Sequence, residues 1–233
     1  ARTNRAAVSA VGSLDREAEA AAALSSMGFE VLVRPDAGLA LRIDHPETCG
    51  SDRQYAARGA LVLALGDWRR GESTSDASVE VLVVDAGTAL TVDAARATDP
   101  RGDLEFLGGA IALGPGELQR AIAGAGARLP EFDLEGEVPA LGKSTREALR
   151  SGAVVGFRGA VRELCVSIAR EAFPGGALPR IFLTGGARSL ALPALTELYG
   201  APQGQLSPAG PGLLEDPMLV HRGLGIAALH HMG

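Results

Sequence analysis

Two β-rich runs, at 79–85 and 89–95, are separated only by a tight turn at Gly87. A turn of this kind joins antiparallel strands. A third run follows at 104–112, after the turn residues of 99–103. The three runs predict an antiparallel meander of three strands, and this feature constrains the fold more than any other in the chain.

Helices alternate with strands after the meander. In order, we expect helices at about 116–128 and 144–172, a strand at 180–184, a helix up to about 199 and a last helix from Asp216. Asp216 can cap that last helix, and Pro217 suits its first turn. Three antiparallel strands followed by alternating helices and strands are the order of a ribonuclease H-like lobe.

The first 68 residues contain strand and helix pieces but no opening meander. The expected pieces are a strand at 7–12, a helix at 14–27 between a Ser13 cap and a Gly28 stop, a strand at 30–34 and a helix at 52–68. A polar loop at 69–78 follows them. We therefore predict an α/β chain of two ribonuclease H-like lobes, the first one incomplete, divided into residues 1–78 and 79–233.

Composition and charge exclude several classes of protein. The 233 residues are 46% hydrophobic and 21% charged, which is typical of a globular chain. A formal net charge of -6 argues against nucleic acid as a partner, and no apolar run is long enough to span a membrane. The two cysteines, Cys49 and Cys165, are far apart, and cysteines and histidines form no cluster that would suit a metal. Together with the lack of a visible signal peptide, these features predict a cytoplasmic location.

The turn between the first two strands has the residues of a phosphate site. Gly87 lets backbone N–H groups face an anion, Thr88 can donate a hydroxyl hydrogen bond, and Asp85 can hold a cation. The alternative is an ordinary hairpin turn of the D-x-G type, which this motif alone would favour. Asp93, at the end of the next strand, is expected to be an exposed carboxylate.

Glycines recur at three further places, one inside the third strand and two where a strand or a helix begins or ends. They are Gly108-Gly109 in the third strand, "LGPGE" at 113–117 before a helix, and "LTGGAR" at 183–188 after a strand. Glycine in a strand weakens it unless a backbone or ligand must approach closely, and a helix start offers free N–H groups to an anion. Tight connections are the alternative in each case, and the chain contains no P-loop motif.

Two helix starts carry candidate substrate residues. In "CGSDRQ" (49–54), Asp52 can accept a hydroxyl proton and Arg53 can hold a substrate carboxylate. The alternative makes Asp52 a helix N-cap and Arg53 a solvated charge. In "LGKSTREAL" (141–149), Ser144 and Glu147 form a capping box, which leaves Thr145 to meet a ligand.

The order of these motifs is more specific than any one of them. Over residues 8–228 the chain resembles the type III pantothenate kinases, through "GSDR", "VVDAGTALTVD", "FLGGAIALGPG", "LGKST", "LTGGA" and "DPMLVHRGL". These kinases belong to the actin-like ATPase superfamily, which also contains acetate kinase, sugar kinases and Hsp70. The resemblance implies two ribonuclease H-like lobes with ATP in the cleft between them.

The resemblance also implies roles for single residues. Asp52 matches the base that acts on the pantothenate hydroxyl, Gly50 and Arg53 match its substrate-binding neighbours, and Thr145 matches a residue of the pantothenate pocket at the dimer interface. Asp85 matches the acidic residue near the phosphates and a bound monovalent cation. On the nucleotide side, Gly87 and Thr88 match the second phosphate loop, and Thr184, Gly185 and Gly186 match the adenosine motif.

The chain departs from the family pattern in three ways. The family opens with a D-x-G-N-T phosphate loop, which also helps to place Mg²⁺, upstream of a segment that corresponds to "VSAVG" at 8–12. That loop does not occur here, so we expect either a chain that begins partway through a longer protein or a protein that lacks half of its phosphate site. Ile43 stands where the family usually has tyrosine or another large residue, and Cys49 replaces an aliphatic one.

The resemblance implies an enzyme that phosphorylates pantothenate to 4'-phosphopantothenate, the first step of coenzyme A biosynthesis. It implies ATP, Mg²⁺ and a monovalent cation, K⁺ or NH₄⁺, and a homodimer. The alternative is a non-catalytic homologue that binds pantothenate or nucleotide, or acts as a transcriptional accessory factor. A sugar or acetate-type kinase fits the fold but not "GSDR" together with "LGKST".

Overall fold

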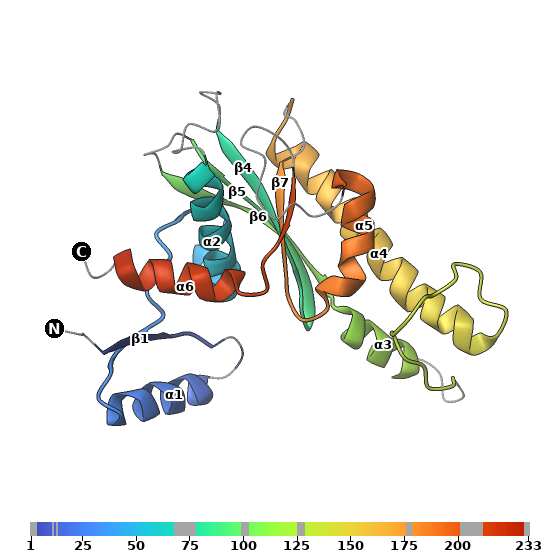
Figure 1. Cartoon of the computed structure of the whole chain (residues 1–233), viewed down its shortest axis with the longest axis horizontal. Helices are drawn as coiled ribbons and strands as arrows, with labels where there is room; N and C mark the ends of the chain where they lie inside the picture. Colours follow the sequence, from blue (N-terminus) through green and yellow to red (C-terminus); the bar gives the residue numbers. More distant parts are fainter. Residues whose placement is uncertain are drawn as a thin grey trace. The chain divides into compact units, whose positions relative to one another are not determined.

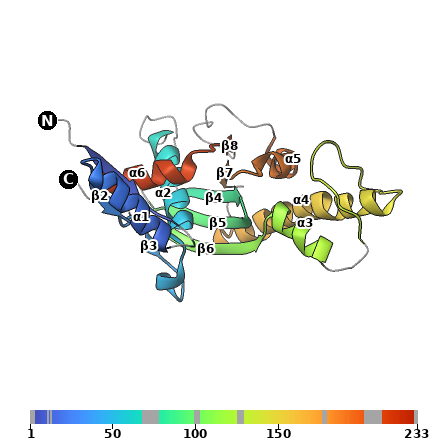
Figure 2. The same ribbon diagram turned by 90° about the horizontal axis from the view of Figure 1, so that it is seen from below.

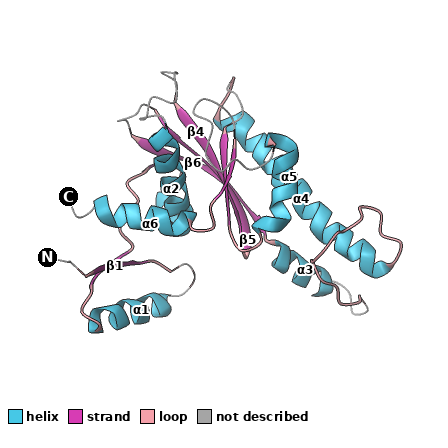
Figure 3. Cartoon of the chain, in the orientation of Figure 1, coloured by secondary structure: helices cyan, strands magenta, loops and turns pink. Residues whose placement is uncertain are grey.

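A computed structural model describes residues 4–10, 12, 14–67, 78–98, 103–124, 129–175, 179–200 and 212–230. Over these residues the chain is mixed α/β (Figure 3). It divides into two compact units, each of which is discontinuous in sequence. The first unit consists of Ala1–Val81, Ala95–Gly108 and Met218–Gly233, and the second consists of Leu82–Ala94 and Gly109–Pro217.

Figure 1 labels most of the elements that follow one another along the chain, and Figure 2 adds labels for β2, β3 and β8. The helices are α1 (Leu14–Ser26), α2 (Ser51–Asp67), α3 (Pro115–Gly124), α4 (Thr145–Ala172), α5 (Arg188–Tyr199) and α6 (Leu219–His230), with a 3-10 turn η1 at Pro46–Thr48. The strands are β1 (Arg5–Val8), β2 (Glu30–Val33), β3 (Ala40–Leu41), β4 (Val79–Ala86), β5 (Ala89–Ala97), β6 (Leu104–Leu113), β7 (Arg180–Thr184) and β8 (Leu213–Glu215).

The predicted meander is confirmed, because β4, β5 and β6 are neighbours in one sheet (Figure 2). That sheet has six strands in the order β3-β6-β5-β4-β7-β8. Only two residues separate β4 from β5, which is too few for a parallel crossover. β7 and β8 pair in parallel, with Ile181 opposite Leu213, and every residue of β7 is buried. A strand buried on both faces explains the unbroken apolar run of residues 181–183.

A separate two-stranded sheet belongs to the first unit. β1 and β2 pair in parallel, with Arg5 opposite Glu30, and α1 connects the two strands. Parallel strands need a crossover of this kind, so the strand-helix-strand order predicted for the first residues is confirmed. Gly28 ends the helix with a φ of 86°, a conformation that favours glycine.

Helices α2 and α6 of the first unit pack backbone against backbone. A β-carbon at Gly59 would lie 2.7 Å from the Leu219 carbonyl oxygen, and one at Gly223 would overlap the Tyr55 backbone. Small residues at these positions allow the close approach. The helical periodicity of the sequence predicts an apolar side made of Tyr55, Ala56, Ala60, Leu61, Leu63 and Ala64. All of these are buried apart from the half-buried Leu63, and Ala57, Gly59 and Leu65 are buried with them.

Several boundaries differ from the sequence-based expectation. β1 spans Arg5–Val8 and not 7–12, and the last helix begins at Leu219 and not at Asp216, whose N–H instead bonds to the Leu183 carbonyl oxygen at 2.9 Å. β3, β8 and η1 were not predicted, because two or three residues are too few to show a periodicity. The Ser13 cap, the loop at 69–77 and the turn at 99–102 lie outside the described residues.

Candidate active site

The hairpin turn between β4 and β5 carries Asp85, Gly87 and Thr88. The Gly87 N–H donates to the Ala89 carbonyl oxygen at 2.9 Å and closes the turn. Thr88 is exposed, and its carbonyl oxygen accepts a hydrogen bond from the Gly114 N–H at 3.0 Å. That N–H is therefore used within the protein, which favours a tight strand-to-helix connection over an anion site at this particular glycine.

The end of β7 lies against the end of β4. Gly185 has a φ of 94°, and a β-carbon there would lie 2.5 Å from the Ala86 carbonyl oxygen and 2.5 Å from Asp85 Oδ1. The Ala187 N–H donates to the Ala86 carbonyl oxygen at 2.8 Å. The fold thus brings two predicted site residues, Asp85 and Gly185, into direct contact although a hundred positions separate them. Only glycine fits at position 185.

The residues on either side of Gly185 differ in their access to solvent. Thr184 is 2% exposed at the end of β7, so its side chain belongs to the interior. Gly186 is exposed, and a β-carbon there would meet nothing within 4 Å. The solvent-accessible part of the 184–186 motif is therefore backbone and not the Thr184 hydroxyl.

Asp93 is buried, which contradicts the exposed position expected from the sequence: the residue is 1% exposed. β5 lies between β4 and β6, and a β-carbon at Gly109 of β6 would overlap both the Val92 carbonyl oxygen and the Asp93 carboxylate. The glycine of the third strand thus admits the neighbouring strand, as the close-approach interpretation predicted.

The "GSDR" residues open α2 in the first unit. The helix begins at Ser51, so Asp52 lies in its first turn and is not the N-cap. Asp52 Oδ1 accepts a hydrogen bond from the Arg53 N–H at 2.9 Å, and the residue is half-buried. A β-carbon at Gly50 would lie 2.5 Å from the same oxygen. The carboxylate therefore has a fixed position near the positive end of a helix and keeps access to solvent.

The side chain of Arg53 is not simply a solvated charge. Its guanidinium carbon lies 5.4 Å from the centroid of the Phe106 ring in β6, which is within the range of a cation–π interaction. Phe106 is fully buried. Phe106 could not be identified from the sequence, since nothing there indicates which aromatic residue will face an arginine 53 positions away.

A buried carboxylate adjoins this pair on β6. Glu105 is 5% exposed and forms ion pairs with Arg96 of β5 at 2.6 Å and with Arg42 at 2.7 Å. Hydrogen bonds from Arg96 and Arg42 hold the pKa of the Glu105 carboxyl below its ordinary value of 4.5, although burial acts in the opposite direction. This ion triad was also missed, because its members are joined only by the pairing of three strands.

Thr145 lies in the second unit, in the first turn of α4, and is exposed. The predicted cap is confirmed: Ser144 accepts a hydrogen bond from the Glu147 N–H at 3.2 Å. The Glu147 carboxylate accepts from the Lys143 N–H at 2.7 Å, one residue earlier than in a standard capping box. The cap thus explains Ser144 and Glu147 and leaves the exposed Thr145 outside it.

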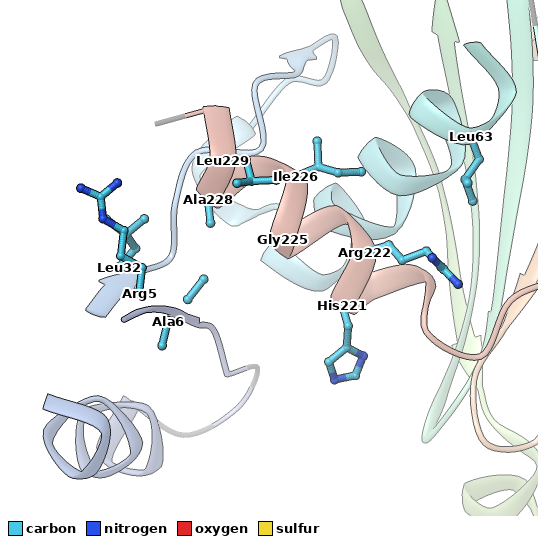
Figure 4. A pocket seen from close by; sticks show the side chains of 11 residues that line it. Arg5, Ala6, Leu32, Leu63, His221, Arg222, Gly225, Ile226, Ala228 and Leu229 are labelled. Carbon is cyan, nitrogen blue, oxygen red and sulfur yellow. The ribbon is translucent and has the colours of Figure 1, made fainter. Parts of the chain in front are cut away.

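Two of the cavities formed by the described residues lie in the first unit. One of about 520 Å³ is lined mainly by apolar side chains of β1, β2, α2 and α6, and it includes none of the predicted site residues (Figure 4). The other, of about 370 Å³, is lined by Gly50 and by neighbours of polar character such as Ser51, Gln54 and Arg34. In the described part of the chain, no three His, Cys, Asp or Glu side chains are grouped to hold a metal, and no helix could cross a membrane.

A family model described as type III pantothenate kinase matches residues 1–167. The chain belongs to the type III pantothenate kinase family. A type III pantothenate kinase of Thermus thermophilus is 38% identical over 156 residues, which are 67% of this chain and 54% of the relative. That of Methylibium petroleiphilum is 40% identical over 165 residues, which are 69% of this chain and 56% of the relative. The chain spans about half the length of these curated relatives.

A solved structure supports the fold independently. A Campylobacter jejuni protein described as a Baf family transcriptional activator superposes with a TM-score of 0.52, over 87% of this chain and 73% of that one. At 18% sequence identity, this likeness concerns the fold alone.

Proposed function

We propose that this protein transfers the γ-phosphoryl group of ATP to the hydroxyl of pantothenate, giving 4'-phosphopantothenate and ADP at the first step of coenzyme A biosynthesis. The observation that carries the proposal is the contact of Asp85 with Gly185, which joins the two nucleotide-side motifs of the family in one place. The "GSDR" residues at the start of α2 supply the second set of groups that the reaction needs.

Asp52 is the proposed base. Its carboxylate, fixed by the Arg53 N–H, would accept the proton of the pantothenate hydroxyl while the oxygen bonds to the γ-phosphorus and the bond to the β–γ bridging oxygen of ATP breaks. Arg53 would hold the pantothenate carboxylate, which guanidinium groups bind well. Gly50 lets the Asp52 carboxylate lie close to the backbone, and Thr145 would line the pantothenate pocket in a homodimer.

The nucleotide would lie on the backbone of Gly87, Thr88 and the motif at 184–186. Gly185 lets the end of β7 approach Ala86 and Asp85 closely, and the open side of Gly186 leaves the backbone accessible to a ligand. Asp85 is the proposed oxygen ligand there for Mg²⁺ or for a monovalent cation, K⁺ or NH₄⁺. Such cations, when bound, neutralise phosphate charge during the transfer.

Three further expectations remain proposals. The meander and the strand-helix-strand segment before it support two ribonuclease H-like lobes, divided between residues 78 and 79. The free thiols of Cys49 and Cys165 fit a reducing compartment such as the cytoplasm. A regulatory role without catalysis is less well supported, because the description of the Campylobacter jejuni protein is attached to a likeness of fold alone.

The test is an ADP-release assay on the product of the complete reading frame that encodes these residues. We expect release that depends on pantothenate and is stimulated by K⁺ or NH₄⁺. Asp52→Asn should lower kcat by roughly 10²- to 10⁴-fold, the usual contribution of a general base. Asp44→Asn, a change at an exposed carboxylate before the same helix, should leave kcat unchanged. No phosphorylated pantothenate from the wild-type protein would refute the proposed function and favour the regulatory alternative.

A further inference from the structure

Phe106 and Arg53 form a cation–π pair whose two members come from different elements. Arg53 lies in the first turn of α2, and its guanidinium carbon lies 5.4 Å from the centroid of the Phe106 ring in β6. The negative face of an aromatic ring attracts a guanidinium at this range. The fully buried ring therefore restricts where the Arg53 head group can lie.

Backbone pairing fixes the position of the ring. Leu41 of β3 is opposite Phe106 in a parallel pair, and the Arg42 N–H donates to the Phe106 carbonyl oxygen at 2.8 Å. Successive side chains of a strand point to opposite faces of the sheet, so Glu105 lies on the other face of β6. There it pairs with Arg42 and Arg96, at 2.7 and 2.6 Å. The strand is thus held from both sides at the point that carries the ring.

The base of the Arg53 side chain is also confined. A β-carbon at Gly50 would lie 4.0 Å from Arg53 Cδ and 2.5 Å from Asp52 Oδ1, so the loop before α2 passes closely over both side chains. A guanidinium is planar, and all its N–H bonds point outward in that plane. One that lies on a ring uses its face for the ring and presents its edge to an acceptor. This arrangement suits a carboxylate, which accepts two parallel hydrogen bonds from such an edge.

We propose that Phe106 is a positioning residue: its ring holds the guanidinium of Arg53 in the orientation that receives the carboxylate of pantothenate. This inference rests on the proposed function and adds to it a residue that does not touch the reacting atoms. Phe106 acts on substrate affinity through Arg53, whereas proton transfer depends on Asp52.

The test compares two substitutions of the ring in the full-length protein. Phe106→Met keeps an apolar side chain of similar volume but removes the aromatic face, and Phe106→Tyr keeps the face. We expect Phe106→Met to raise the KM for pantothenate roughly 5- to 30-fold, the range expected for loss of a partly desolvated cation–π contact. The KM for ATP and the kcat should each change less than about twofold. Phe106→Tyr should have a pantothenate KM close to that of the wild type.

A second comparison separates positioning from a general effect on folding. In an Arg53→Ala background, Phe106→Met should cause no further rise in the pantothenate KM, because the ring then has nothing to orient. With pantothenol, the analogue that has an alcohol in place of the carboxylate, Phe106→Met should leave the KM unchanged. If Phe106→Met shows no cooperative unfolding transition, Phe106→Leu replaces it in both comparisons, since leucine is also apolar and lacks the aromatic face.

The outcomes distinguish the inference from the function on which it rests. A wild-type protein that does not phosphorylate pantothenate refutes both. An active wild type with an unchanged pantothenate KM in Phe106→Met, or with the same rise in the presence and absence of Arg53, overturns the positioning role alone.

Discussion

Gly185 is the residue at which the structure leaves no space for a side chain. Its φ of 94° is strained for any other residue, and a β-carbon would lie 2.5 Å from the Ala86 carbonyl oxygen and Asp85 Oδ1. We predict that Gly185→Ala lowers the free energy of unfolding by about 1–3 kcal/mol and raises the KM for ATP at least about tenfold, because Asp85 must move. Urea unfolding and initial-rate kinetics measure the two effects.

Gly186→Ala is the matched control for this prediction. A β-carbon at Gly186 would meet nothing within 4 Å, and its φ lies outside the left-handed range. Its free energy of unfolding should therefore stay within about 0.5 kcal/mol of the wild type. Equal effects of the two substitutions would contradict the close contact at Gly185.

The sequence predicted the identities of the site residues better than their surroundings. Asp85 and Gly185 were identified from glycine-rich strand ends, and the structure brings them into contact. The burial of Asp93 and the cation–π contact of Arg53 were not predicted, because each depends on a neighbouring strand that the local sequence does not reveal. Local residue types indicate what chemistry a side chain can perform, but pairing between strands decides what it touches.

Glu105 links three strands, and its ionisation contributes to their stability at neutral pH. Its pKa is lowered in the folded protein by Arg96 and Arg42, so the stabilisation is fully present above the ordinary value of 4.5 and is lost as the pH falls through the lower folded pKa. We predict that Glu105→Gln lowers the free energy of unfolding at pH 7 by about 1–2 kcal/mol, a value reduced by the partial exposure of both arginines.

The pH dependence provides the check. In urea unfolding, the difference between wild type and Glu105→Gln should shrink between pH 7 and pH 3. Glu30→Gln is the control, since the ion pair of Glu30 with Arg5 is largely exposed and should contribute at most about 0.5 kcal/mol at either pH. A difference that is the same at both pH values would show that the Glu105 charge does not stabilise the fold.

The N-terminus of α4 depends on a single hydroxyl. Ser144 accepts the Glu147 N–H at 3.2 Å, and loss of such a cap costs about 1 kcal/mol. We predict that Ser144→Ala lowers the free energy of unfolding by that amount, whereas Ser144→Asp, which keeps an acceptor, stays near the wild type. Urea unfolding of both variants measures the two free energies. Equal destabilisation by alanine and aspartate would rule out the cap.

Long elements were predicted well and short ones were not. The helices α1, α2 and α4 and the strands β4 to β7 follow from periodicity, caps and turn residues within a few positions of their observed ends. β3 and β8 have two and three residues, so they exist only because a longer strand pairs with them. For this reason, the pairing of β3 with β6, which fixes Phe106, could not be predicted from the sequence.

At the scale of the whole molecule, the two sets of proposed binding residues belong to different compact units. The residues at 50, 52 and 53 lie in the first unit, and those at 85–88 and 184–186 lie in the second. Binding of each ligand can therefore be detected separately, through the segment whose amide exchange it slows. This separation makes amide hydrogen exchange a suitable measurement, because a bound ligand slows the local opening of the segment it contacts.

We predict that ATP with Mg²⁺, added without pantothenate, slows exchange in peptides that cover 85–88 and 184–186. At a free concentration 100 times the Kd, opening that requires release of ATP should slow about 100-fold. Pantothenate alone should slow exchange in peptides that cover 50–53. Asp85→Asn, assayed beside the wild type, should abolish the first effect and leave the second intact, because only the nucleotide side uses that carboxylate. Protection of 50–53 by ATP alone, with no change at 85–88, would contradict the assignment of the nucleotide to the second unit.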